Sequence, residues 1–166
     1  EKKEFEFDEN GGSFSINVKS NVDYKVIIDD NWVKEETTPS TRSLIDNNHT
    51  FTVAKMGSDI ERESKITFSD KKTGVSNEVV VKQKRLLFLE SSSQTMMMNN
   101  DKLLKCTNLT NQKLKWTSSN PSVASVDENG KVTAISKGTT IITVSTIDDK
   151  HSYSCSITVK DITDFV

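Results

Sequence analysis

The sequence predicts an all-β protein built as two tandem antiparallel β-sandwiches. Apolar and polar residues alternate with a period of two along nearly the whole chain, which is typical of strands that bury one face. No stretch repeats apolar residues at the i, i+3, i+4, i+7 spacing of an amphipathic helix. The 166 residues suffice for two small domains, and turn signals recur at intervals of about 8–12 residues, as in sandwiches.

The first half contains a series of alternating segments, and we expect each of them to be a strand. Glycines fall at the breaks between the segments, where a backbone that needs positive φ would place them. The segments are residues 5–7, 14–18, 24–28, 51–53, 66–68 and 79–81.

The second half repeats the pattern. Asp127-Glu128-Asn129-Gly130 is the clearest hairpin signal, because Asn-Gly tolerates the turn geometry that matches strand twist. The run Met96-Met97-Met98 fits an edge strand or a filler of core gaps. The expected strands are residues 114–116, 132–134, 140–144 and 157–159.

We place the domain boundary after residue 84, which gives domains at residues 1–84 and 85–160. The junction around Lys82–Arg85 has no Gly, Pro or Ser, whereas a flexible tether is rich in them. We therefore expect a stiff coupling and an elongated pair of sandwiches. Residues 161–166 have the apolar spacing of a further strand, so both ends of the chain look cut from a longer protein.

Composition excludes several classes of partner. The 22 Lys and Arg residues balance 24 Asp and Glu residues, and the net charge of −2 lacks the positive excess that nucleic-acid binding needs. No apolar run approaches the roughly 20 residues of a membrane span. We expect a monomer without a nucleic-acid partner and without a membrane span in this segment. The chain shows no signal peptide, which a processed protein would lack in any case.

The two cysteines, Cys106 and Cys155, leave two interpretations open. Each sits within an alternating strand pattern, without metal-ligand spacing and without a neighbouring histidine. They are either two small buried apolar residues or a disulfide across the sandwich, which would require an oxidising compartment.

Residues 86–159 carry a long ordered motif. It runs from Leu114-x-Trp116-x-Ser118-Ser119-Asn120-Pro121 through Gly130-x-Val132-Thr133-Ala134 to Gly138-Thr139-Thr140. This stretch resembles the bacterial immunoglobulin-like domain of group 2, the type found in intimin- and invasin-like surface proteins. Met98-Asn99-Asn100-Asp101 stands where the family commonly has a glycine turn.

Residues 5–84 carry a second set of matches. They include Gly11-Gly12, Ser20-Asn21-x-x-Tyr24, Trp32-Val33, Arg62-x-x-x-Ile66-Thr67 and Val79-Val80-Val81-Lys82-Gln83. This half resembles a BACON domain, a small β-sandwich of secreted and surface proteins from gut-dwelling bacteria. Tyr24 stands where that family usually has Trp, and Lys55 where Asn is common.

The two resemblances imply immunoglobulin-like sandwiches in a secreted or cell-surface protein, for instance an outer-membrane lipoprotein. BACON domains were proposed to bind carbohydrate or mucin. Group 2 immunoglobulin-like domains are associated with adhesion and with spacing other domains away from a cell. Neither family supplies catalytic residues or a cofactor.

No catalytic or metal motif emerges from the residues themselves. The histidines, His49 and His151, lie in what look like turns, and no nucleophile pairs with them in a known motif. The acidic runs at 29–31, 99–101 and 148–149 lack a calcium-binding loop, and Asp and Asn gather in tight turns for backbone reasons. We expect no enzyme activity, no cofactor and no metal site.

Sugar-binding sandwiches usually expose aromatic rings, so the placement of the aromatic side chains tests whether this chain binds sugar. Most of the rings are in phase with apolar neighbours, as Trp116 is with Leu114, and such rings favour the core. Trp32, which follows a turn, and Tyr153 are the candidates for exposed rings.

The two resemblances, rather than the aromatic residues, imply a non-enzymatic surface module for adhesion or carbohydrate recognition. Its partners would be a glycan or a host surface glycoprotein, together with other domains of the same protein. The alternative is a rigid spacer that presents another domain away from the cell.

Overall fold

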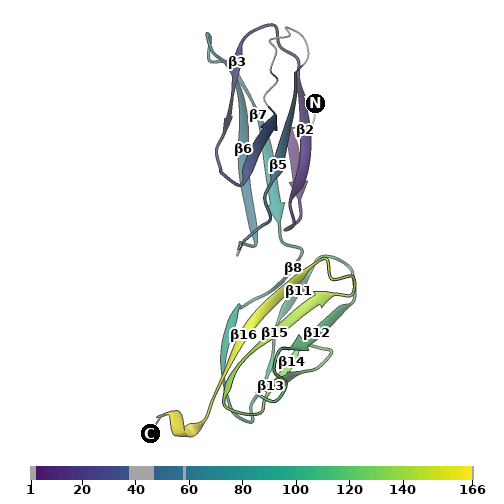
Figure 1. The fold of residues 1–166 in the computed structure, drawn as a ribbon, viewed down its shortest axis with the longest axis vertical. Coiled ribbons are helices and arrows are strands. Elements are labelled where there is room, and N and C mark those ends of the chain that lie inside the picture. Colours follow the sequence, from purple (N-terminus) through teal and green to yellow (C-terminus); the bar gives the residue numbers. More distant parts are fainter. Residues whose placement is uncertain (1–2, 38–46, 58, 166) are drawn as a thin grey trace. The chain divides into compact units, whose positions relative to one another are not determined.

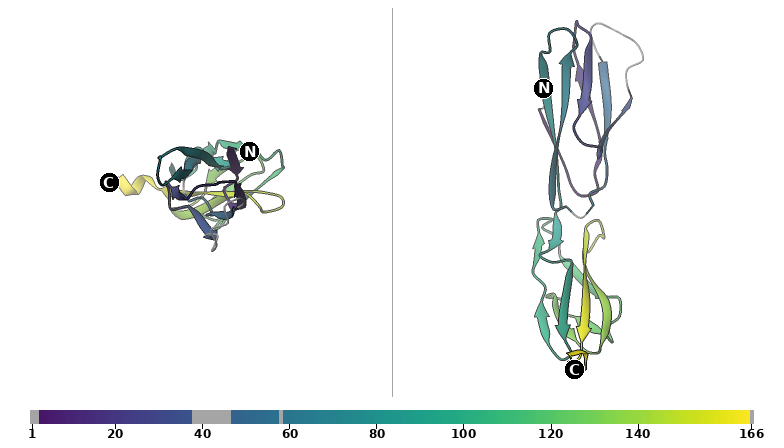
Figure 2. Two further views of the ribbon diagram at one scale, coloured as in Figure 1. Left: turned by 90° about the horizontal axis from the view of Figure 1, so that it is seen from above. Right: turned by 90° about the vertical axis from the view of Figure 1, so that its left-hand side faces the viewer.

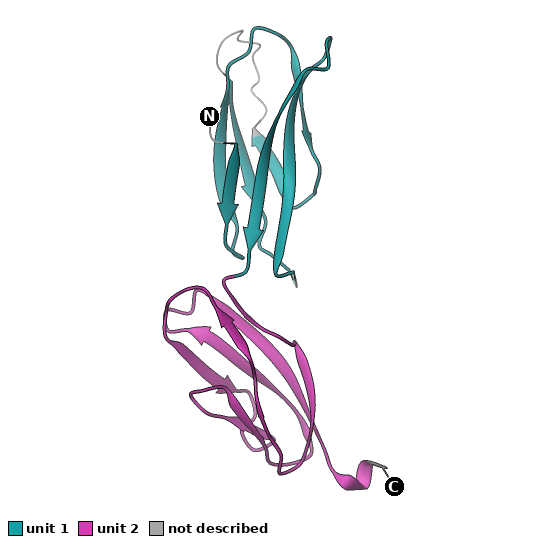
Figure 3. Ribbon diagram, turned by 180° about the vertical axis from the view of Figure 1, so that it is seen from behind, with its two compact units in different colours: residues 1–85 teal, residues 86–166 magenta. Residues whose placement is uncertain are grey.

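The chain divides into two units, residues 1–85 and 86–166 (Figure 3). The structure is a computed structural model, and it describes residues 3–37, 47–57 and 59–165. The boundary predicted from the sequence lies one residue earlier, after residue 84. No helix in the described part of the chain is long and apolar enough to cross a membrane.

Unit 1 consists of two sheets (Figures 1 and 2). Strands of both sheets supply the core: Val33, Phe51 and Val53 from one, Ile66 and Val81 from the other, all at most 4% exposed. The four-stranded sheet has the order β1 (Glu4–Phe7), β7 (Ser76–Lys84), β6 (Glu61–Asp70) and β3 (Tyr24–Ile28), and the three-stranded sheet has the order β2 (Gly12–Val18), β5 (Asn47–Val53) and β4 (Val33–Thr37).

Unit 2 also packs its sheets around one core, but one of its two layers is divided into two smaller sheets. Its core joins residues of all three sheets, including Leu87, Val132, Ile142 and Ile157, each fully buried. The sheets have the orders β12 (Leu114–Ser118), β15 (Gly138–Thr146), β16 (Ser152–Lys160) and β9 (Ser93–Met97); β10 (Asp101–Leu103), β14 (Lys131–Ala134) and β13 (Ala124–Val126); and β11 (Cys106–Asn108) and β8 (Leu87–Leu89).

The all-β prediction is confirmed, but the pairing is not antiparallel throughout. In unit 1, β1 runs parallel to the last strand, β7, and in unit 2 β9 runs parallel to the last strand, β16. Alternation along a strand does not reveal the direction of its neighbour, because parallel and antiparallel strands share the period of two.

The turns form where their residues predict them, and in one of them an asparagine stands where a glycine is expected. The 127–130 turn joins β13 to β14 as an antiparallel hairpin, and Gly130 has φ +82°. Asn99, in the place of the family's glycine turn, takes φ +68°, a left-handed conformation that Asn tolerates better than most residues. The prediction that the methionine run forms an edge strand is confirmed for Met96 and Met97. They are the last two residues of β9, which lies at the edge of its sheet.

The C-terminal prediction of a further strand is wrong. Ile162–Phe165 forms a short 3-10 helix, and Ile162 is 72% exposed. The Asp164 carboxylate accepts the backbone N–H of Asp161 and contacts the Lys137 ammonium, so local polar bonds stabilise this turn. Apolar spacing alone does not make a strand, because a strand also needs a neighbour with which it forms backbone hydrogen bonds.

The prediction that His49 lies in a turn is also wrong. His49 belongs to β5 and is 2% exposed. Its Nε2 lies 2.7 Å from the Tyr24 hydroxyl, and its Nδ1 lies 2.5 Å from a carboxylate oxygen of Glu35. Burial raises the pKa of Tyr24, as does the nearby Glu35 carboxylate. If the Tyr24 hydroxyl donates to Nε2, the Nδ1–H donates to Glu35, and each polar atom of this buried chain is satisfied.

We expect Glu35→Leu to destabilise unit 1 by about 1–3 kcal/mol, because it leaves a buried imidazole N–H without an acceptor. The matched control is Glu36→Leu. Glu36 is exposed and accepts a hydrogen bond from Thr52, so its loss should change the free energy of unfolding by no more than about 0.5 kcal/mol. Urea unfolding followed by circular dichroism measures both variants. Equal effects would show that the buried chain contributes nothing specific.

Candidate functional site

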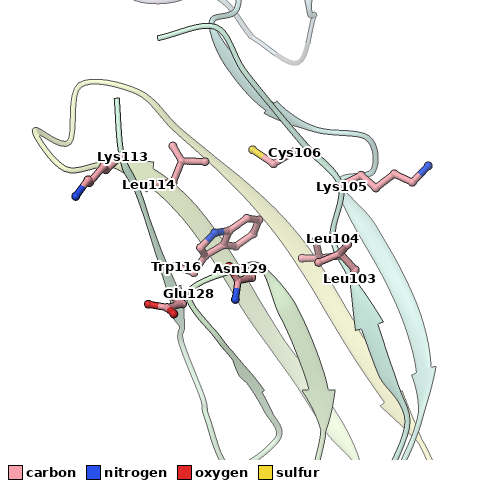
Figure 4. A pocket seen from close by; sticks show the side chains of 9 residues that line it. All are labelled: Leu103, Leu104, Lys105, Cys106, Lys113, Leu114, Trp116, Glu128 and Asn129. Carbon is pink, nitrogen blue, oxygen red and sulfur yellow. The ribbon is translucent and has the colours of Figure 1, made fainter. Parts of the chain in front are cut away.

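Unit 2 carries an open groove of about 590 Å³ around Trp116, here called the Trp116 groove (Figure 4). Three segments meet there: β12 with the residue before it, the stretch that joins β10 to β11, and the 127–130 turn. The groove is lined by Leu103, Leu104, Lys105, Cys106, Lys113, Leu114, Trp116, Glu128 and Asn129.

The position of the indole depends on a glycine. Trp116 shares the inward face of β12 with Leu114 and packs against the core of unit 2. A Cβ atom on Gly130 would lie 2.6 Å from a ring carbon of Trp116, so only glycine lets the indole rest on this backbone. One part of the ring therefore covers the turn, while the side chain stays partly exposed and lines the groove.

Hydrogen bonds within the turn hold two polar side chains at the rim. Asp127 accepts the backbone N–H groups of Asn129 and Lys131 at its side chain, both at 2.9 Å. The backbone N–H of Leu104 donates to the carbonyl of Gly130 at 3.0 Å, which ties the turn to the opposite wall. Glu128 and Asn129 thus stand beside the indole on a fixed support (Figure 4).

Four polar groups of the groove are available to a ligand, whereas the Lys105 ammonium is paired with Glu90. Among the described residues, no hydrogen bond or ion pair engages the side chains of Glu128, Asn129 or Lys113, or the indole N–H of Trp116. The rim therefore offers a carboxylate, an amide and an ammonium around an aromatic ring and leucine side chains. A ring for stacking with nearby planar polar groups suits a ligand that has both an apolar face and hydroxyl groups.

Trp32, one of the two rings predicted to be exposed, is partly covered by another side chain. The guanidinium carbon of Arg62 lies 4.3 Å from the centre of its ring, a cation–π contact. Arg62 also donates to the Gln83 side chain at 2.8 Å, and burial lowers the pKa of its guanidinium. Trp32 packs against the core of unit 1, where Gln83 is 1% exposed.

Tyr153, the other predicted ring, is in β16 opposite Val144 and packs against the core of unit 2. Neither Trp32 nor Tyr153 is among the residues that line the Trp116 groove.

Both cysteines are free thiols in the structure, which is the first of the two interpretations. Cys155 is fully buried in the core of unit 2, and Cys106 packs against that core from β11. Burial raises the pKa of both thiols, so neither is activated as a nucleophile.

The histidines offer no accessible base. Both ring nitrogens of His49 already have partners, and His151 is 7% exposed beside the β15–β16 turn. Within the described ranges, no three His, Cys, Asp or Glu side chains converge to hold a metal ion. Asp148 and Asp149 instead bind Thr146 and Lys115 in and around that turn.

Sequence reasoning missed Trp116 as a site residue because its alternation with Leu114 indicates burial. The alternation is right about the direction of the side chain, which does point inward. It cannot show that the sandwich is open at this edge, where no described strand pairs with the outer side of β12. The Asn-Gly turn was a usable signal, since it marks the place where a bulky ring meets a bare backbone.

Comparison with known protein families gives a match for part of the chain. Residues 77–157 match the profile of the Bacterial Ig-like domain (group 2), beginning in β7 and ending in β16. Two uncharacterized proteins of Clostridium acetobutylicum are similar, one 45% identical over 56 residues and the other 42% identical over 53 residues. These matches cover 33% and 31% of this chain, and they span only 14% and 6% of the relatives' own lengths.

Similar solved structures include other tandem β domains. Titin Ig tandem domains align at a TM-score of 0.37 with 10% identity, over 95% of this chain and 93% of that one. Human Protocadherin-24 EC1-2 aligns at 0.37 with 10% identity, over 96% and 94%. The Bacteroides ovatus mixed-linkage glucan protein SGBP-B, solved with a heptasaccharide, aligns at 0.31 with 16% identity, over 89% and 41%.

We expect Gly130→Ala to destabilise unit 2 by about 3 kcal/mol, since it adds a steric clash with Trp116 to the cost of a left-handed alanine. Gly74→Ala is the control: Gly74 has φ +73°, but a Cβ there meets nothing within 4 Å, so only the backbone cost of about 1 kcal/mol remains in unit 1. Thermal unfolding with tryptophan fluorescence measures each unit. A loss at Gly130 no larger than at Gly74 would show that the indole does not rest on this turn.

Proposed function

We propose that the chain is a non-catalytic carbohydrate-recognition module of a secreted or surface-anchored bacterial protein, with its sugar site in the Trp116 groove. The observation that carries the proposal is the partly exposed indole held beside the unpartnered side chains of Glu128 and Asn129. A pyranose would stack one apolar face on the ring and direct its hydroxyl groups to the carboxylate and the amide.

The size and chemistry of the groove support this role. A volume of about 590 Å³ falls within the roughly 300–1,000 Å³ of small-molecule sites and would admit one or two sugar rings. The match of residues 77–157 to a family that occurs in surface and extracellular proteins supports the location. The resemblance of residues 5–84 to BACON domains concerns unit 1, so it favours a glycan or a host surface glycoprotein as a partner of the chain but does not bear on a site in unit 2.

A glycan array, followed by isothermal titration calorimetry with the best sugar, tests the proposal. We expect Trp116→Ala to weaken binding by about tenfold or more, because it removes the stacking surface at the centre of the site. Glu128→Gln and Asn129→Ala, which alter exposed side chains without touching the core, should each weaken binding about five- to tenfold.

Thr117→Ala is the matched control for this experiment. Thr117 is exposed on the opposite face of β12, so its loss should leave the affinity unchanged. The proposal fails if no glycan binds, or if binding survives in all three groove variants.

A rigid spacer is the second candidate, and a specific observation favours it. Only residues 85 and 86 separate β7 from β8, and each is bound within its own unit. The backbone N–H of Arg85 donates to the carbonyl of Ile60 at 2.7 Å, and the carbonyl of Leu86 accepts the N–H of Leu109 at 2.8 Å. A joint with so little free backbone would limit the motion of one unit against the other.

Small-angle X-ray scattering distinguishes a stiff joint from a loose one. Insertion of Gly-Ser-Gly-Ser between Arg85 and Leu86 should broaden the distribution of the radius of gyration, because Gly/Ser segments behave as flexible coils. If the natural chain is already as broadly distributed as the variant with the insertion, the spacer role is excluded.

A further inference from the structure

A second, smaller groove of unit 2 adjoins the Trp116 groove and is here called the Gln94 groove. Its volume is about 290 Å³, and it lies between the β8–β9 connection and the segment of residues 102–105. Residues 103–105 line both grooves, so this segment separates one from the other. The polar residues that line the Gln94 groove include Glu90, Gln94, Lys102 and Lys105.

The segment between the two grooves is fixed on both sides by backbone hydrogen bonds. On the side of the Trp116 groove, the N–H of Leu104 donates to the carbonyl of Gly130 at 3.0 Å. On the side of the Gln94 groove, the N–H of Glu90 donates to the carbonyl of Lys105 at 3.1 Å. Leu104 is buried, whereas the neighbouring Leu103 is 57% exposed. Leu103 thus offers an apolar surface over which a chain-like ligand can pass from one groove to the other.

The Gln94 groove has a positive excess that its own residues do not neutralise. The Lys102 ammonium donates to the side-chain oxygen of Gln94, which is neutral, and it forms no ion pair within the described ranges. Lys105 pairs with Glu90 at 3.6 Å, and both side chains are largely exposed to water, so this ion pair contributes little. Because an ammonium has three donors, each lysine can still give a charge-assisted hydrogen bond to an anion.

The charges of the two grooves are arranged with a direction. Lys102 reaches β9 and Lys105 reaches the residue after β8, so both ammonium groups lie on the Gln94 side of the separating segment. Figure 4 shows Lys105 extending away from Trp116. The Glu128 carboxylate lies on the other wall of the Trp116 groove, in the 127–130 turn. An anionic group is therefore repelled at the turn and attracted at the Gln94 groove.

We propose that the Trp116 groove and the Gln94 groove form one continuous site for an acidic oligosaccharide. The proposal rests on the carbohydrate-recognition function proposed above and specifies the class of sugar. One sugar ring stacks on the indole, the glycan chain crosses Leu103, and a sugar carboxylate binds Lys102 and Lys105. The Gln94 groove, at about 290 Å³, adds room for about one more ring.

Paired probes that differ only in charge test the class of sugar. The probes are sialyllactose, which represents host glycoproteins, and tetragalacturonate, which represents plant polysaccharides. Isothermal titration calorimetry compares each with its methyl ester, which keeps the sugars but removes the negative charge. We expect at least one of the two acids to bind, about tenfold more tightly than its ester, because only the acid is attracted by the two lysines.

The outcomes separate this inference from the function on which it rests. If a neutral glycan of the array binds but neither acid binds more tightly than its ester, the acidic class is wrong and carbohydrate recognition stands. If no glycan binds at all, both proposals fail.

Charge variants of the protein locate the carboxylate. Lys102→Gln should reduce the ratio of acid affinity to ester affinity about fivefold, whereas Glu90→Gln should raise it about twofold, because it removes the competing carboxylate from Lys105. The matched control is Lys25→Gln, which removes the same charge as Lys102→Gln from an exposed position of β3 in unit 1 and should leave the ratio unchanged. Equal effects of Lys102→Gln and Lys25→Gln would show attraction by net charge alone and overturn the continuous site.

Discussion

Each sheet of this protein has one apolar face, and that constraint shapes everything else in the structure. A sheet with one apolar face is stable only when a second sheet covers it, so each unit pairs its sheets around a single core. Two such sheets meet well at their centres and less well at their edges, where no further strand continues the cover. The Trp116 groove lies at such an edge, beside β12.

The two units use polar groups in opposite ways. In unit 1, the hydrogen-bonded side chains of Tyr24, His49 and Glu35 are buried and bind one another. Their hydrogen bonds therefore orient the strands that meet there. In unit 2, Glu128 and Asn129 stand at an open rim without partners in the described chain, so they retain their capacity for a ligand. The same group, a glutamate carboxylate, is thus bound within the fold at Glu35 and without a partner in the described chain at Glu128.

The sequence was a sound guide wherever a local rule decides. Alternation located most of the strands, though not β4 or β13, and the Asn-Gly pair located the turn that ends at Gly130. It failed where a distant partner decides: His49 looked like a turn residue because Asp and Asn precede it, yet β2 and β4 draw this segment into a sheet. The strand predicted at 161–166 is wrong for a related reason: residues 162–165 pair with no described strand and form a 3-10 helix instead.

By itself the sequence determined the all-β class, the positions of most strands and the inward direction of Trp116, because period-two alternation and turn residues act through the local backbone. Only the tertiary structure decided which inward side chains stay accessible. Exposure depends on whether another strand covers the edge, and that pairing joins residues far apart in the chain. Trp116 points inward yet lines an open groove, while Trp32 follows a turn yet lies under Arg62.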